Sequence, residues 1–232
     1  MTPLLEVEAA RPVPGASPIQ GAVTLRLAPG DLALVHAEDP AMARALALLC
    51  AGLVKLAAGE VRFLAQDWAA LPRQPAQALR GRIGLAPGDG GWLPHLTVAD
   101  GMLLACRHHG STPDAELRSE AVALCKQFGL PGLPLRHPAE LNRVDLARAG
   151  CARAFLGAPE LILLESPLDQ ETADLLAEPL LAALAPARER GAAALWSTRS
   201  RRAWNTPGFP ASQWWVLQQD GLKGDEPCLA PR

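Results

Sequence analysis

The feature that most constrains the fold is the run Leu161-Ile162-Leu163-Leu164, which is apolar without interruption. A strand with one face in water alternates apolar and polar residues, whereas a strand covered on both faces does not. Residues 32–36 and 192–197 have the same character, and helical patterns separate the three runs. Strands that alternate with helices predict an α/β fold built on a parallel sheet.

Periodicity and turn residues place the remaining elements. Further strands are expected at residues 23–27, 59–63, 82–86 and 214–217. Helices are expected at residues 41–51, from 97, at 112–128, from Pro138 to 155, and at 170–190. The sequence therefore predicts a mostly helical insertion, at about residues 95–155, between the strands of one sheet.

Composition excludes several classes of protein. Of the 232 residues 49% are hydrophobic and 20% charged, with a net charge of -2, which excludes a disordered chain and a basic nucleic-acid-binding surface. No apolar run approaches the roughly 20 residues that cross a bilayer, and the first eight residues form no basic leader. These features predict a soluble, cytoplasmic protein that binds no nucleic acid.

Cysteine and histidine give no signal for a metal. The five cysteines are scattered, which favours free thiols. Cys106-Arg107-His108-His109 is the one cluster, but neighbouring histidines point to different faces of a helix, so a solvated helix end is the simpler interpretation. We expect no metal site.

The order of these elements, with the stretches 140–154 and 159–169, resembles the ATP-binding cassette (ABC) ATPases. The likeness covers about residues 20–224. Residues 90–98 and 107–110 loosely resemble the branch that serves lipid-trafficking importers of the MCE (Mla-like) type. The resemblance implies a P-loop NTPase-like sheet with an antiparallel N-terminal β part and a helical insertion. It also implies one domain over residues 1–224, followed by a flexible tail, 225–232.

The phosphate loop of that family, G-x-x-x-x-G-K-[ST], cradles phosphates with backbone N–H groups, a lysine and a Mg²⁺-binding hydroxyl. In register, Ala37 replaces the first glycine, Met42 the second, Ala43 the lysine and Arg44 the hydroxyl residue. Asp39 stands where it can bind the helix N-terminus itself. Arg44 either offers a charge to a phosphate or lies on a solvated helix face.

The other positions that carry the family's chemistry are changed as well. Gly88 replaces the Q-loop glutamine, and the signature L-S-G-G-Q reads Leu141-Asn142-Arg143-Val144-Asp145. Glu165 replaces the Walker B aspartate, Ser166 the catalytic glutamate and Arg199 the switch histidine, whereas Asp169 of the D-loop is kept. A serine hydroxyl is not acidic enough to act as a general base near neutral pH. We therefore expect no catalytic residue and no cofactor.

These losses predict a catalytically degenerate subunit, a pseudo-ATPase, that acts as scaffold or regulator of a membrane transport complex at the inner face of the membrane. Its partners would be a transmembrane permease, an intact ABC ATPase, or both, and a dimer is possible. A divergent ATPase that still binds ATP and Mg²⁺, through Arg44 and Glu165, is the alternative. A fold adapted to an unrelated ligand or to a soluble regulatory role is the third.

The resemblance places the partner interface at residues 87–104. Gly88, Trp92, Leu93 and Asp169 are its candidate residues, with Trp92 expected as an exposed anchor. The basic run 199–202 is either a solvated loop or a contact for a phosphate or lipid headgroup. Trp204, Trp214 and Trp215 are expected to pack the C-terminal strands, and stacking on a ligand would require a pocket beside them.

Overall fold

The computed structural model describes residues 2–109, 112–168 and 172–225. Its centre is a six-stranded sheet in the order β10-β9-β3-β8-β7-β6. All neighbouring pairs are parallel except β10 and β9. The strands are β3 (Leu32–His36), β6 (Ile83–Ala86), β7 (Leu161–Glu165), β8 (Ala193–Thr198), β9 (Gln213–Gln218) and β10 (Gly221–Gly224). The predicted α/β fold with a parallel sheet is confirmed.

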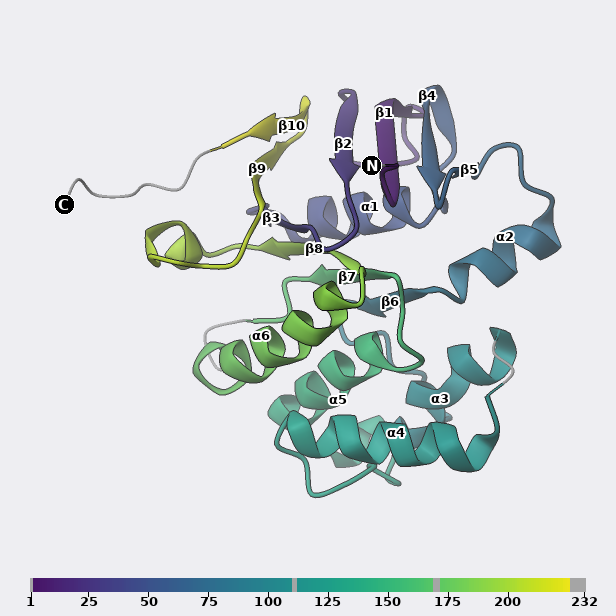
Figure 1. Cartoon of the computed structure of the whole chain (residues 1–232), viewed down its shortest axis with the longest axis vertical. Coiled ribbons are helices and arrows are strands. Elements are labelled where there is room, and N and C mark those ends of the chain that lie inside the picture. The colour runs from purple at the N-terminus through teal and green to yellow at the C-terminus, as the bar shows by residue number, and fades with distance from the viewer. Residues whose placement is uncertain (1, 110–111, 169–171, 226–232) are drawn as a thin grey trace.

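A second sheet, antiparallel and four-stranded, lies above the first in Figure 1. Its order is β2-β1-β4-β5, and β1 pairs with both β2 and β4. The strands are β1 (Leu5–Pro12), β2 (Val23–Leu27), β4 (Leu56–Phe63) and β5 (Gln66–Asp67). The antiparallel N-terminal part expected from the resemblance is therefore present.

The six-stranded sheet separates two apolar layers. Alternate residues of a strand point to opposite faces, and β3 shows both, since all five of its residues are buried. Ala33 and Val35 contribute to the core that contains α1 (Pro40–Cys50) and the antiparallel sheet. Leu34 contributes to the core formed with the helices on the other face. Figure 1 shows α1 between the two sheets.

The helices of that other face come from the predicted insertion and from the segment after β7. They are α3 (Val98–His109), α4 (Asp114–Gln127), α5 (Arg143–Phe155) and α6 (Ala173–Glu189). The first three contact one another, and α5 also packs against β6 and β7. The division into domains stays a prediction. Asp225 of the predicted tail donates its N–H to the Trp214 carbonyl, 2.8 Å away, and residues 226–232 lie outside the described ones.

The predicted helix from Pro138 to residue 155 was wrong at its start. Residues Pro138–Glu140 form a short 3-10 turn, Leu141 is extended, and α5 begins only at Arg143. The cause is local, because the Asn142 side chain accepts the N–H of Asp145 at 2.8 Å and so fixes a new helix start. The signature positions therefore lie at the N-terminus of α5.

Within the described ranges, no helix has the length and apolarity needed to span a membrane. Over the same residues, no group of three or more His, Cys, Asp or Glu side chains is placed to hold a metal ion. Cys50, Cys106, Cys125 and Cys151 are free thiols, as expected. Burial raises the pKa of the Cys50 thiol to about 12, so that thiol stays protonated near neutral pH.

Candidate functional site

The phosphate-loop positions form a tight strand-to-helix turn, and most of its N–H groups at the start of α1 are already bound. Only residues 37–39 separate β3 from α1. The Asp39 side chain accepts the N–H of Ala41 at 2.8 Å, and its carbonyl accepts those of Met42 at 3.0 Å and Ala43 at 3.3 Å. Pro40 has no N–H and suits the first helical position. The three N–H groups at the start of α1 that could bind a phosphate are therefore satisfied within the chain.

The positions of the second glycine and the lysine are part of the core. Met42 is 4% exposed and Ala43 2% exposed, both in the apolar cluster between the two sheets. Ala43 carries no charge, and its short side chain ends among apolar neighbours. The turn thus offers no cation where the motif has one.

Arg44 makes contacts that sequence reasoning left open. Its Nη1 lies 3.5 Å from Oε2 of Glu165 and 3.5 Å from Oδ1 of Asp89. The N–H of Gly88 donates to the same Glu165 oxygen at 3.2 Å. We call Arg44, Asp89 and Glu165 the Arg44 bridge. It joins α1, the loop after β6 and the end of β7, and it directs the charge of Arg44 to two carboxylates of its own chain.

The structure thus brings together three predicted site residues, Arg44, Gly88 and Glu165, and adds Asp89. The sequence analysis missed Asp89, although it directly follows Gly88. Glycine fits at position 88 because a Cβ there would lie 2.9 Å from the Glu165 carbonyl oxygen. The loop can therefore approach the end of β7 closely enough for the bridge to form.

Glu165 has an unusual electrostatic environment. It is 3% exposed, and its Oε1 has no hydrogen-bond partner within the described ranges. Burial raises the pKa of this carboxyl, and Asp89 adds to the rise, while the Gly88 N–H and Arg44 lower it. The net direction is upward. Ionised Glu165 is therefore disfavoured by the fold despite the nearby guanidinium.

The raised pKa of Glu165 predicts how the free energy of unfolding depends on pH. A carboxyl whose folded pKa lies above its ordinary value of 4.5 favours folding below that pH, and the contribution is lost as the pH rises through the folded pKa. Glu165→Gln removes this titration. We expect the free energy of unfolding of the wild type to fall relative to that of Glu165→Gln as the pH rises above 4.5, measured by urea unfolding.

The matched control is Arg44→Ala. Arg44 lowers the pKa of Glu165, so its removal should raise that pKa further and make the fall steeper. If the difference in the free energy of unfolding between the wild type and Glu165→Gln did not change with pH, the proposed environment of Glu165 would be contradicted.

Ser166, at the position of the catalytic glutamate, has a backbone φ of 45°. This left-handed conformation is uncommon for a residue with a side chain. Its Oγ is buried and has no hydrogen-bond partner among the described residues. Ser166 is therefore a turn residue at the end of β7, and within the described ranges its hydroxyl is hydrogen-bonded to no base.

The signature and switch positions meet at a cavity beside α6. Asn142 caps α5, as described above, and Arg143 and Val144 occupy the first turn of that helix. Asp145 places a carboxylate in the same turn and pairs with Arg148 at 3.0 Å. Arg143 and Arg199 both line the cavity. The switch position also stays next to the phosphate-loop turn, because the carbonyl of Thr198, the residue before Arg199, accepts the N–H of Ala37 at 3.0 Å.

The expectation that Trp92 is an exposed anchor was wrong. Its ring is half-buried beneath the guanidinium of Arg153, 4.4 Å from the ring centroid, and its Nε1 is buried. Arg153 also donates to the Gly90 carbonyl at 2.7 Å, and burial lowers its pKa to about 10. Leu93 is 41% exposed. Asp169 lies outside the described residues, and the partner interface stays a prediction.

The residues present do not fit Mg²⁺ and the phosphates of ATP. Such a site needs unbound N–H groups, a lysine and an oxygen ligand for the metal. Here the N–H groups of residues 41–43 are bound, Ala43 is buried, and Arg44 puts a cation at the hydroxyl position, beside the carboxylate that would face the metal. Two cations at one carboxylate would repel each other.

The amino-acid sequence is similar to those of several ATP-binding proteins. No family model matches the chain. The methionine import ATP-binding protein MetN of Rhizobium etli is 31% identical over 161 residues, which are 68% of this chain and 44% of that protein. The cell division ATP-binding protein FtsE of Escherichia coli K12 is 28% identical over 153 residues, 66% of this chain and 68% of FtsE. The chain thus spans less than half the length of the methionine import relatives it matches.

Solved structures agree on the fold. The dimeric ATP-binding cassette MJ0796, bound to ADP and Pi, superposes with a TM-score of 0.77 at 18% identity, covering 97% of this chain and 99% of that one. CbiO1 of Clostridium perfringens, part of the transporter complex cbiONQ, superposes with a TM-score of 0.72 at 16% identity. The superposition covers 96% of this chain and 88% of CbiO1. The order of strands and helices, the likeness of sequence and the likeness of fold agree, and the chain belongs to the family of ATP-binding cassette (ABC) transporter subunits.

Proposed function

We propose that this chain is a non-hydrolysing ABC subunit, a pseudo-ATPase that acts as scaffold or regulator of a membrane transport complex. The observation that carries the proposal is the Arg44 bridge. Arg44 replaces the residue whose hydroxyl holds Mg²⁺ in the motif, and its guanidinium lies 3.5 Å from the carboxylate of Glu165. A side chain of the protein thus takes the charge-neutralising role that a metal ion has in an active member.

The loss of catalytic and phosphate-binding groups at other positions also supports a subunit that does not hydrolyse ATP. Phosphoryl transfer depends almost entirely on positioning and on electrostatic stabilisation of the phosphates. One missing charge clamp costs on the order of 10² to 10⁵ in rate. Here the phosphate loop lacks its lysine, Ser166 replaces the catalytic glutamate, and the α5 N-terminus is capped by its own Asn142. Losses at three separate places leave no plausible route to hydrolysis.

The partners follow from the family. The relatives named above are ATP-binding proteins of methionine import and cell division, and the MJ0796 cassette is dimeric. We propose that this chain docks on a transmembrane permease, on an intact ABC ATPase, or on both, at the inner face of the membrane. The loop from Pro87 and the start of α3, with Leu93 exposed, is the proposed contact.

A hydrolysis assay tests this proposal. We expect phosphate release from Mg-ATP by the purified chain to match that of Glu165→Gln, because no catalytic step passes through Glu165. The same comparison is made on the complex after co-purification with its permease. A wild-type rate that falls in the Glu165→Gln variant would show that the chain is the divergent ATPase instead.

The cargo is a separate part of the proposal. We propose lipid trafficking because the loop sequence at residues 90–98 resembles that of the MCE-serving branch. The genes beside this one provide the test. A permease and an MCE-type protein encoded there would support a lipid pathway, and a soluble binding protein for an amino acid would contradict it.

A further inference from the structure

A cavity of about 1090 Å³ lies between α6, the ends of β3 and β8, and the segment after β8. Leu34 and Trp196 contribute to it, and both belong to the core on the face of the sheet opposite α1. The cavity is therefore on the other side of the sheet from the phosphate-loop helix. Its volume is at the upper end of the range for small-molecule sites, about 300–1,000 Å³.

The charged lining of this cavity is mostly basic. Among the described residues, Arg143, Arg199 and Arg202 line it, against one acidic residue, Asp174. Within the described part of the chain, the side chains of Arg199 and Arg202 form no hydrogen bond and no ion pair. Arg201, between them, pairs with Asp225 at 3.2 Å instead. Two guanidinium groups at the cavity are thus available to an anion.

The apolar lining is rich in aromatic groups. Aromatic residues are only 4% of the chain, yet Trp196 and Phe209 both line the cavity, with ring centroids 5.9 Å apart. Behind them Trp214 contacts Phe209 at 5.8 Å and Trp204 at 5.0 Å. An apolar or aromatic body can therefore pack against rigid rings on one side of the cavity.

Trp196 is the most deeply buried aromatic residue of this lining. Its side chain is 4% exposed, and its Nε1 has no acceptor within the described ranges. This N–H is itself closed to a water-sized probe, so the ring contributes an apolar wall and no donor to the cavity.

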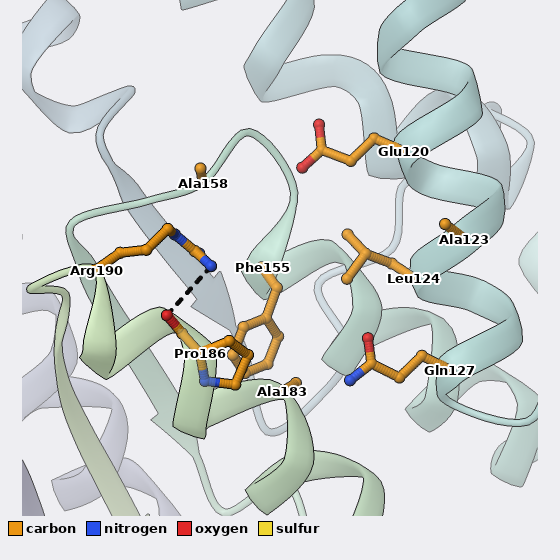
Figure 2. A pocket seen from close by; sticks show the side chains of 9 residues that line it. All are labelled: Glu120, Ala123, Leu124, Gln127, Phe155, Ala158, Ala183, Pro186 and Arg190. Atoms are coloured by element: carbon orange, nitrogen blue, oxygen red, sulfur yellow. Dashed lines mark hydrogen bonds between the residues drawn. The ribbon is translucent and has the colours of Figure 1, made fainter.

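Another cavity among the described residues lacks these features. It has a volume of about 340 Å³ and lies between α4 and α6 (Figure 2). Arg190 donates there to the Pro186 carbonyl at 3.2 Å, as the dashed line in Figure 2 marks. Glu120 accepts the N–H of Gly157 at 3.0 Å. The charged side chains of this cavity are thus engaged by their own backbone.

We propose that the cavity beside α6 binds a small amphipathic anion, an apolar chain or ring that carries one carboxylate, phosphate or sulfate group. Arg199 and Arg202 bind the anionic group, and the walls formed by Trp196 and Phe209 contact the apolar body. Free inorganic phosphate would leave the apolar walls uncovered, and a neutral hydrocarbon would leave both guanidinium groups unpaired. The proposed ligand is not ATP, and the cavity faces the side of the sheet opposite α1, although Arg199 stands at the switch position.

Titration calorimetry of the full chain with decanoate tests the proposal. We expect saturable 1:1 binding, weakened at least about tenfold in the double variant Arg199→Ala/Arg202→Ala, because two charge-assisted hydrogen bonds are lost. Arg199→Lys/Arg202→Lys should recover most of the binding. Ala177→Phe adds a ring to the α6 wall without changing a charge, and it should weaken binding as well.

The matched control is Arg190→Ala, which removes the same charge from the other cavity and should bind decanoate as the wild type does. Circular dichroism and the thermal midpoint establish that each variant is folded. If Ala177→Phe does not fold, the arginine variants alone decide the outcome.

Three results would overturn the proposal. One is the absence of saturable decanoate binding, and another is unchanged affinity in the double arginine variant. The third is equally tight binding of inorganic phosphate, which would make the site a simple anion site. Sedimentation with phosphatidylglycerol vesicles distinguishes a free amphipathic ligand from the headgroups of a membrane surface. Vesicle binding without decanoate binding would mean that the basic run contacts a membrane surface and not a ligand in the cavity.

Discussion

We expect Trp204→Ala to lower the free energy of unfolding by about 3 to 5 kcal/mol, the usual cost of removing a large buried aromatic side chain. Trp204 is 2% exposed and is among the largest fully buried side chains. Its ring meets Trp214 edge-on at 5.0 Å and His36 at 6.0 Å, so the substitution removes aromatic contacts and leaves a cavity. Urea unfolding with an unchanged m-value would measure the loss.

The control for this prediction is Trp215→Ala. Trp215 is the next residue to Trp214 on β9 and is only half-buried, so its removal should cost clearly less. Because Trp204 also holds the segment that carries Arg199 and Arg202, Trp204→Ala should weaken decanoate binding too. A loss of stability below about 1 kcal/mol would contradict the packing described for this cluster.

The second large effect is expected at Gly84, in β6. A Cβ at this position would lie 1.8 Å from the carbonyl oxygen of Ala154 in α5 and 2.9 Å from Cγ of Pro159. Backbone atoms cannot move away as a flexible side chain can, so Gly84→Ala must push α5 off the sheet. We expect a loss of about 3 kcal/mol or more in the free energy of unfolding.

Gly150→Ala is the control within α5 itself. The nearest atom to a Cβ at Gly150 is Cζ2 of Trp92, 4.0 Å away, so the new methyl group has room. Alanine is a better helix former than glycine, and the variant should be more stable by about 0.5 to 1 kcal/mol. If both variants changed stability by the same amount, the close approach of β6 and α5 would be wrong.

The central strands could be predicted from the sequence because burial on both faces leaves a continuous apolar run. Residues 32–36 were predicted as a strand and form β3, and the run Leu161-Ile162-Leu163-Leu164 lies in β7, which extends by one residue to Glu165. Strand β1 (Leu5–Pro12) was missed. It alternates polar and apolar residues, carries a register shift between Val7 and Ala10, and depends on β2 and β4 for its pairing. The alternation over residues 5–8 is itself a strand signal, which the sequence analysis overlooked.

The candidate site also divides into features that a local motif predicts and contacts that it does not predict. The loss of the lysine at Ala43 can be read directly, because the phosphate loop is a local motif. The partners of Arg44 cannot be predicted in this way, because Asp89 and Glu165 come close to Arg44 only when β6 and β7 pair. Trp92 was expected at the surface for a similar reason, because the residue that covers it, Arg153, is on α5. Contacts between distant segments decide what each candidate residue can do.

Calorimetric titration of the purified chain with Mg-ATP tests the central claim most directly, because it asks whether the filled turn at the start of α1 accepts a nucleotide. The bound N–H groups, the buried Ala43 and the Arg44 bridge predict no saturable heat up to about 1 mM nucleotide. Stoichiometric binding with a dissociation constant in the micromolar range would contradict the claim that this fold has lost its nucleotide site.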